Sequence, residues 1–132
     1  MDEAYRDAMR EHVEQLAEEL AEIGQRLAEG PRTQILYRAT ERSLQLLVEA
    51  CIGIAKQTLK GRGVQVPSDA RQVFAKLGAL GLDLTGADWN RIIGLRNVLV
   101  HDYLNLSPER ITEVVKGGSY KVLLEFARAL LR

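Results

Sequence analysis

An arginine, a histidine and a tyrosine fall within the stretch Arg96–Tyr103 of a chain of 132 residues. Histidine titrates near neutral pH and can therefore either accept or donate a proton. Arginine is permanently charged, and its planar fork of donors can hold two oxygens of one phosphate group. The tyrosine adds a hydroxyl group. This combination is suited to proton transfer beside a bound phosphate.

Other constellations of catalytic or ligand-binding residues are missing from the sequence. Two histidines, His12 and His101, and one cysteine, Cys51, are too few for a Cys/His zinc site, so no metal and no other cofactor is expected. Cys51 lies in an apolar segment, where an inert buried thiol is more common than a nucleophile. His12 lies on a charged helix and is expected to be solvated. Gly61-Arg62-Gly63 is too short to cradle a phosphate and is better explained as a turn.

The apolar residues of the first half of the chain recur at intervals of three and four, which predicts helices. A first helix is expected over Asp2–Glu29 and is stopped by Gly30-Pro31. A second helix, about Thr33–Lys60, is apolar on more than one side and should lie in the middle of a bundle. Ser68 is the expected N-cap of a short third helix.

The second half of the chain predicts two further helices. One begins near Ala87 or Asp88 and carries the Arg96–Tyr103 stretch. Ser107-Pro108-Glu109 is a strong start signal for the last helix, which Gly117-Gly118 should kink or split. The sequence therefore predicts an all-α fold, an up-and-down bundle of four long helices and one short helix, with residues 1–132 forming a single domain.

The formal net charge of zero conceals an uneven distribution. Residues 1–29 hold nine acidic and three basic side chains, a net of −6, whereas residues 30–132 hold fifteen basic and nine acidic ones, a net of +6. A basic surface that attracts a polyanion is compatible with this pattern, although a solvated acidic helix beside a mildly basic bundle explains the charge alone. The single cysteine, the glutamate-rich N-terminus and the lack of a membrane-spanning apolar run indicate a cytoplasmic protein.

The stretch RNVLVHDY, from Arg96 to Tyr103, resembles the signature of the HEPN superfamily, an arginine followed after four to six residues by a histidine. It is more specifically similar to the HepT branch, whose pattern is Arg-x4-His-x-Tyr, and Arg96, His101 and Tyr103 match every defining position. The resemblance covers roughly residues 30–130, including the helix ILYRATERSLQLLVEACIGIA, the short third helix and the leucine-rich last helix.

The resemblance implies a homodimeric, metal-independent endoribonuclease toxin of a type II HEPN/MNT toxin–antitoxin system. By motif position, Arg96 and His101 would be the catalytic residues, in a cleft at the dimer interface. The implied partners are an RNA substrate and a nucleotidyltransferase antitoxin of the MNT type, which silences the toxin by transferring AMP to Tyr103. The alternatives are a HEPN-fold protein that binds or is modified by a nucleotidyltransferase without cleaving RNA, and a purely structural helical dimer.

The spacing of the motif adds a geometric condition. Five residues of helix turn through about 500°, so Arg96 and His101 point roughly 140° apart. Either the helix ends near His101, or the arginine reaches around it, or each Arg96 serves the His101 of the other chain. A two-fold dimer would also supply the second histidine that separate acid and base roles require. We assign supporting roles to Asn97, which would orient the imidazole, and to Glu41, for which a surface ion pair is an equal alternative.

Overall fold

The computed structural model describes residues 1–101, 104 and 106–132, and within them the chain forms six α-helices and no strands. These are α1 (Glu3–Glu29), α2 (Gln34–Gly61), α3 (Ala70–Ala79), α4 (Trp89–His101), α5 (Pro108–Lys116) and α6 (Lys121–Leu130). The predicted all-α fold class is confirmed. The last predicted helix is divided into α5 and α6, because Gly118 has a φ of 70°, a left-handed conformation that interrupts an α-helix.

The helices begin at local capping signals. Asp2, Thr33 and Ser107 cap α1, α2 and α5 with side-chain oxygens that accept backbone N–H groups. The prediction for α3 was wrong by one residue: the cap is Asp69 and not Ser68. The Asp69 carboxylate accepts the N–H of Arg71 at 3.0 Å, so it satisfies an otherwise free donor of the first turn and the helix begins one position later.

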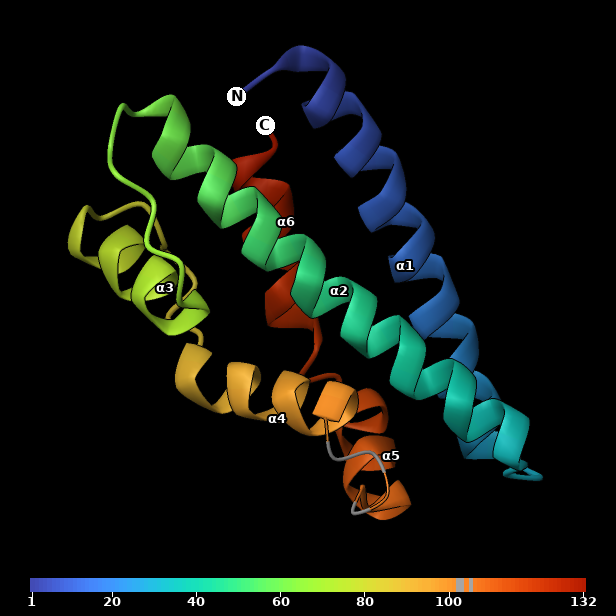
Figure 1. Cartoon of the computed structure of the whole chain (residues 1–132). Coiled ribbons are helices and arrows are strands. Elements are labelled where there is room, and N and C mark those ends of the chain that lie inside the picture. Colours follow the sequence, from blue (N-terminus) through green and yellow to red (C-terminus); the bar gives the residue numbers. More distant parts are fainter. Residues whose placement is uncertain (102–103, 105) are drawn as a thin grey trace.

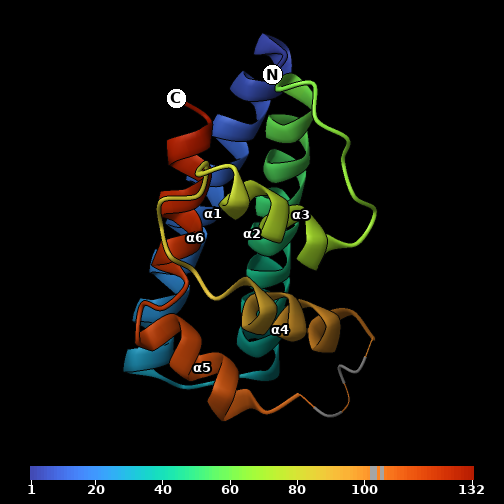
Figure 2. The same cartoon turned by 90° about the vertical axis from the view of Figure 1, so that its left-hand side faces the viewer.

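The second helix occupies the centre of the bundle, as its broad apolar surface predicted. α2 packs against every other helix. Figures 1 and 2 show α1 running alongside it, α6 between α1 and the α3–α4 side, and α4 and α5 at the end of the bundle opposite the two termini. Among the described residues, no helix combines the length and apolar content needed to cross a membrane.

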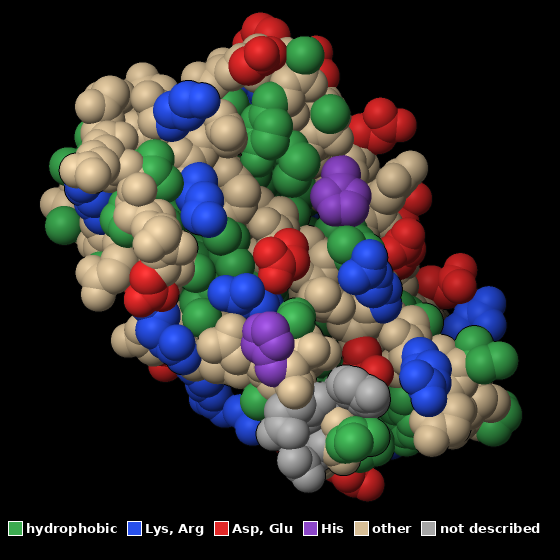
Figure 3. Space-filling view, viewed as in Figure 1, with side chains coloured by type: hydrophobic (Ala, Val, Ile, Leu, Met, Phe, Trp, Pro, Cys, Tyr) green, Lys and Arg blue, Asp and Glu red, His purple; other side chains and the backbone are tan. Residues whose placement is uncertain are grey.

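The surface preserves the charge asymmetry of the sequence. Acidic side chains gather along the edge formed by α1, and basic side chains are spread over the rest of the face shown in Figure 3. The N-terminal half of α2 is the more exposed part of this helix, and Ile35 there is 80% exposed. The apolar residues of its first turns are therefore not all buried, although the sequence predicted a helix buried on more than one side. From Leu47 to Ala55, by contrast, Glu49 is the one residue classed as exposed.

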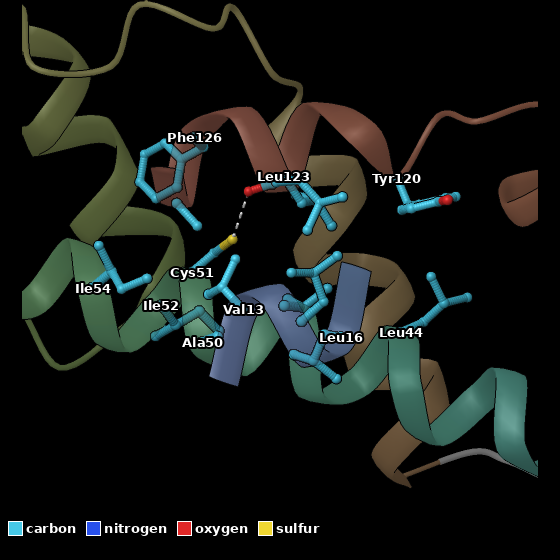
Figure 4. Packing of buried hydrophobic residues seen from close by; sticks show 14 of the residues in the cluster. Val13, Leu16, Leu44, Ala50, Cys51, Ile52, Ile54, Tyr120, Leu123 and Phe126 are labelled. Atoms are coloured by element: carbon cyan, nitrogen blue, oxygen red, sulfur yellow. Dashed lines mark hydrogen bonds between the residues drawn. The ribbon is translucent and has the colours of Figure 1, made fainter. Parts of the chain in front are cut away.

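The hydrophobic core lies where α1, α2 and α6 meet (Figure 4). Its members include Val13 and Leu16 of α1, Cys51 of α2, and Leu123 and Phe126 of α6, all at most 5% exposed. Full burial of a leucine-sized side chain contributes about 1.5–3 kcal/mol, so this cluster supplies most of the driving force for folding.

An aromatic cluster attaches the start of α4 to this core. The Trp89 ring stacks on Phe74 of α3 at 3.8 Å between centroids and meets the edge of Phe126 at 4.7 Å. The Trp89 indole N–H donates to Asp83 Oδ2 at 2.6 Å. Packing and hydrogen bonding thus fix the first turn of the helix that carries the predicted site.

Candidate active site at the end of α4

His101 is the last residue of α4, and its side chain is exposed. Because residues 96–101 are all helical, the roughly 140° between the directions of Arg96 and His101 persists within one chain.

Arg96 is turned toward α2. Its Nη1 lies 3.6 Å from Oε1 of Glu49, and the two side chains are 22% and 43% exposed. Its Nε is buried and has no hydrogen-bond partner among the described residues. A buried donor without a partner is costly and often marks a group whose ligand is absent. The Glu49 carboxylate thus lies near Nη1 of the guanidinium, while Nε remains available to donate to a further acceptor.

Glu49 was not singled out by the sequence reasoning, although a signal for it exists. It is the only charged residue between Arg42 and Lys56, a stretch that is otherwise largely apolar. A charge in such a stretch needs either an exposed position or a partner, because an unpaired buried charge is strongly unfavourable. In the structure Glu49 faces α4 through its ion pair with Arg96.

Glu41 and Asn97 were the predicted supporting residues. Both are half-buried, on α2 and α4 respectively. The ion pair of Arg96 is with Glu49, which lies eight residues, or about two turns, beyond Glu41. Asn97 is one turn before His101 on the same side of α4, as its spacing predicted. Their roles in the site stay predictions.

Tyr103, the predicted modification site, lies outside the described residues. On either side of it, Val100 is 37% exposed and Leu104 is 85% exposed. The end of α4 therefore combines an exposed histidine with exposed apolar side chains.

The predicted site residues do not line the main hollow near α4. That hollow, of about 360 Å³, lies between α2, α4, α5 and α6 and has an apolar floor that includes Leu44, Val48 and Leu123. Arg91 and Arg110 lie among its polar residues, whereas Arg96, Asn97 and His101 do not border it. The candidate site is thus an open surface and not a closed pocket of one chain.

The remaining groups considered in the sequence have structural positions. Cys51 is buried, its Sγ donates to the carbonyl of Leu123 at 3.4 Å, and burial raises the pKa of the thiol, which confirms the predicted inert cysteine (Figure 4). His12 was expected to be solvated, but it is half-buried on α1 and so is only partly open to solvent. Among residues 1–101, 104 and 106–132, no three His, Cys, Asp or Glu side chains are grouped so as to hold a metal ion.

Comparison with known proteins agrees with the predicted fold class and with the predicted family. Residues 9–130 match the family model described as "Ribonuclease HepT-like". The chain is similar to the mRNA nuclease HepT of Shewanella oneidensis, with 33% identity over 76 residues, which span 56% of this chain and 57% of that relative. The fold is also similar to a solved structure described as "Crystal structure of the toxin-antitoxin with AMP-PNP", with a TM-score of 0.77, 20% identity and coverage of 98% and 99% of the two chains. Because the family model covers most of the sequence, this chain belongs to the HepT-like ribonuclease family.

Proposed function

We propose that this protein is a homodimeric, metal-independent endoribonuclease toxin, controlled by an MNT-type nucleotidyltransferase antitoxin that transfers AMP to Tyr103 in the cytoplasm. The observation that carries the proposal is the sequence pattern of Arg96, His101 and Tyr103 in a HepT-like chain, with Arg96 and His101 in the last part of α4. A relative named an mRNA nuclease and a similar fold in a toxin–antitoxin structure support the class of activity and the kind of partner.

The proposed reaction is attack of an RNA 2′-hydroxyl on the adjacent phosphorus. A base removes the 2′-hydroxyl proton, the P–O bond to the 5′-oxygen breaks, and an acid protonates that oxygen, which leaves a 2′,3′-cyclic phosphate and a 5′-hydroxyl. Neutral His101 acts as the base, and protonated His101 of the partner subunit acts as the acid. The Arg96 guanidinium stabilises the charge that develops on the phosphorane oxygens.

The orientation of the two residues supports a site built from two chains. Arg96 is directed at Glu49, and the exposed His101 lies roughly 140° away around α4, so one chain does not converge both side chains on one phosphate. A two-fold axis near the end of α4 places Arg96 of one chain beside the partner's His101. The exposed Val100 and Leu104 provide apolar surface for such an interface.

The proposed control acts through charge. Tyr103 lies two residues after His101 in sequence. Transfer of AMP from ATP to its hydroxyl releases pyrophosphate and a proton and leaves a phosphodiester, whose negative charge repels an RNA phosphate from the same site. Asn97 orients the imidazole through a side-chain hydrogen bond to one ring nitrogen, which leaves the other nitrogen to exchange the proton.

The decisive experiment is RNA cleavage by the purified protein in the presence of a chelator. We expect cleavage products with 2′,3′-cyclic phosphate ends, and a loss of activity of at least 100-fold in His101→Ala and Arg96→Ala. His12→Ala is the matched control, because it removes the other histidine without touching α4. Intact RNA after incubation with the unchanged protein, across substrates, would instead favour a non-catalytic partner of a nucleotidyltransferase.

The antitoxin part of the proposal has its own test. Incubation with the cognate nucleotidyltransferase and ATP should increase the mass of the chain by one AMP group and abolish cleavage. Tyr103→Phe should retain cleavage and gain no mass. If the nucleotidyltransferase still silences Tyr103→Phe, control does not act through this hydroxyl.

A further inference from the structure

One face of α4 carries a polar stripe that leads to His101. Asn90, Gly94, Asn97 and His101 are spaced by four, three and four residues, which places them on the same side of the helix. Asn90 and His101 are exposed, and Gly94 and Asn97 are half-buried. Because Gly94 has no side chain, the middle of the stripe is open to a group from elsewhere.

The group that reaches this stripe is Arg71 of α3. Its Nη2 donates to the backbone carbonyl of Asn90 at 3.4 Å. The same nitrogen lies 3.7 Å from the position that a Cβ atom would take on Gly94. The guanidinium therefore lies over the polar face of α4, and one of its donors is engaged by the helix.

Arg71 also retains its charge for a ligand. It is exposed, and among the described residues no carboxylate forms an ion pair with it, in contrast to Arg96, which is paired with Glu49. A guanidinium carries five N–H donors in a planar fork, so the contact with Asn90 leaves donors for phosphate oxygens.

We propose that Arg71 is a second phosphate-binding residue, which holds the RNA backbone on the polar stripe of α4 about 10 Å from His101. This inference rests on the proposed function. The distance follows from the seven-residue step from Gly94 to His101, at 1.5 Å of helix rise per residue. It corresponds to roughly three nucleotides at the rise of about 3.4 Å of a stacked strand. Arg71 therefore contacts RNA beyond the bond that is cleaved.

Substrates of two lengths distinguish phosphate binding by Arg71 from a purely structural role, in which Arg71 only joins α3 to α4. For a ten-nucleotide RNA, we expect Arg71→Gln to raise KM about fivefold and to leave kcat unchanged. For a dinucleotide, which lacks the distant phosphate, we expect no change in kcat/KM. Arg62→Gln is the matched control, because it removes the same charge at the end of α2 opposite α4 (Figure 1). Equal losses on both substrates would show a structural role and overturn the inference.

Binding measurements keep this test independent of cleavage. In a His101→Ala background, fluorescence anisotropy with the same ten-nucleotide RNA should give an about fivefold weaker Kd for Arg71→Gln. The slope of log K against log salt should fall by about 0.7, the value for one phosphate contact in a single strand. Binding without cleavage by the unchanged protein would refute the proposed function and still test Arg71. Unchanged affinity and slope in Arg71→Gln, or no RNA binding by the His101→Ala chain at low salt, would overturn the inference.

Discussion

Helices α1 and α4 differ in where the ion-pair partners of their arginines lie. The arginines of α1 pair with carboxylates one turn away on the same helix, as Arg6–Glu3, Arg10–Asp7 and Arg26–Glu22. In α4, Arg96 pairs with Glu49 of the neighbouring helix α2. Within the described part of the chain, Arg91 and His101 make no ion pair. Both helices bury apolar residues, but among the described residues all three arginines of α1 are paired, whereas Arg91 of α4 is not.

This difference indicates that α1 mainly stabilises the fold, whereas α4 carries the groups that can act on a ligand. Ion pairs within one exposed helix contribute about 0.3–0.5 kcal/mol each, so the pairs of α1 mainly keep its surface neutral while its buried stripe stabilises the fold. Uncompensated basic groups on α4 contribute little to stability but attract anions. If this comparison is right, changes in α1 should alter stability without altering the chemistry, and changes around α4 should do the reverse.

The largest expected effect is on stability and lies in α1. Leu20 is fully buried, so Leu20→Ala leaves a cavity and should lower the free energy of unfolding by about 3 kcal/mol. Urea denaturation measures this loss, and kcat of the folded fraction should be unchanged. Leu84→Ala is the control: Leu84 is 91% exposed, and its truncation should change stability by less than about 0.5 kcal/mol. A loss of kcat in Leu20→Ala would break the separation between the helices.

The next effect concerns the attachment of α4. Asp83 accepts the indole N–H of Trp89 at 2.6 Å and the hydroxyl of Thr85 at 2.6 Å. Asp83→Ala leaves both donors without this acceptor and should cost about 2 kcal/mol. Relative to the unchanged chain, hydrogen exchange in Asp83→Ala should be accelerated more in the first turn of α4 than in α1. Uniform loss of protection in both helices would show that Trp89 anchors the whole bundle and not α4 in particular.

The helices and their order were predictable from the sequence because each depends on local signals. Apolar spacing, the Asp2 and Ser107 caps and the helix-interrupting glycines act within a few residues, so a linear pattern contains them. The errors were local too: the choice between Ser68 and Asp69 is a competition between two adjacent capping residues.

The candidate site was predictable only in part, because it depends on contacts between distant segments. The motif predicted Arg96 and His101, but nothing in the sequence paired Arg96 with Glu49, which lies 47 positions earlier. Likewise, Arg71 reaches α4 only through the packing of α3. Periodicity within one helix does not encode which residues of two helices meet.

Two glutamates of α2 test which acid supports Arg96. We expect Glu49→Gln to lower kcat about tenfold, because the guanidinium loses the carboxylate 3.6 Å from Nη1 that positions it. Stability should change by less than about 1 kcal/mol, since the pair is partly exposed. The matched variant Glu41→Gln should change kcat by less than about twofold. A larger effect in Glu41→Gln would assign the supporting role to Glu41, as the sequence predicted, and equal effects would indicate a general influence of charge.

The smallest expected effect is that of the pair that joins α1 to α6. Arg128 Nε and Nη2 donate to the two carboxylate oxygens of Glu14 at 2.8 and 2.7 Å. Both side chains are about half exposed, so Arg128→Ala should cost only about 0.5 kcal/mol, and the cost should shrink in 1 M salt. The hydrogen bond to Arg128 lowers the pKa of Glu14 from its ordinary value of 4.5.

A lowered carboxyl pKa fixes the sign of the pH dependence. The pair stabilises the fold above pH 4.5, where Glu14 is ionised in both states, and this contribution is lost as the pH falls through the lower pKa of the folded state. Thermal unfolding of the unchanged chain and of Arg128→Ala should therefore differ at neutral pH and converge on acidification. A difference that persists in acid would mean that Arg128 acts through packing of its aliphatic stem against α1. Cleavage should be the same in both proteins at neutral pH, because neither residue lies on α4.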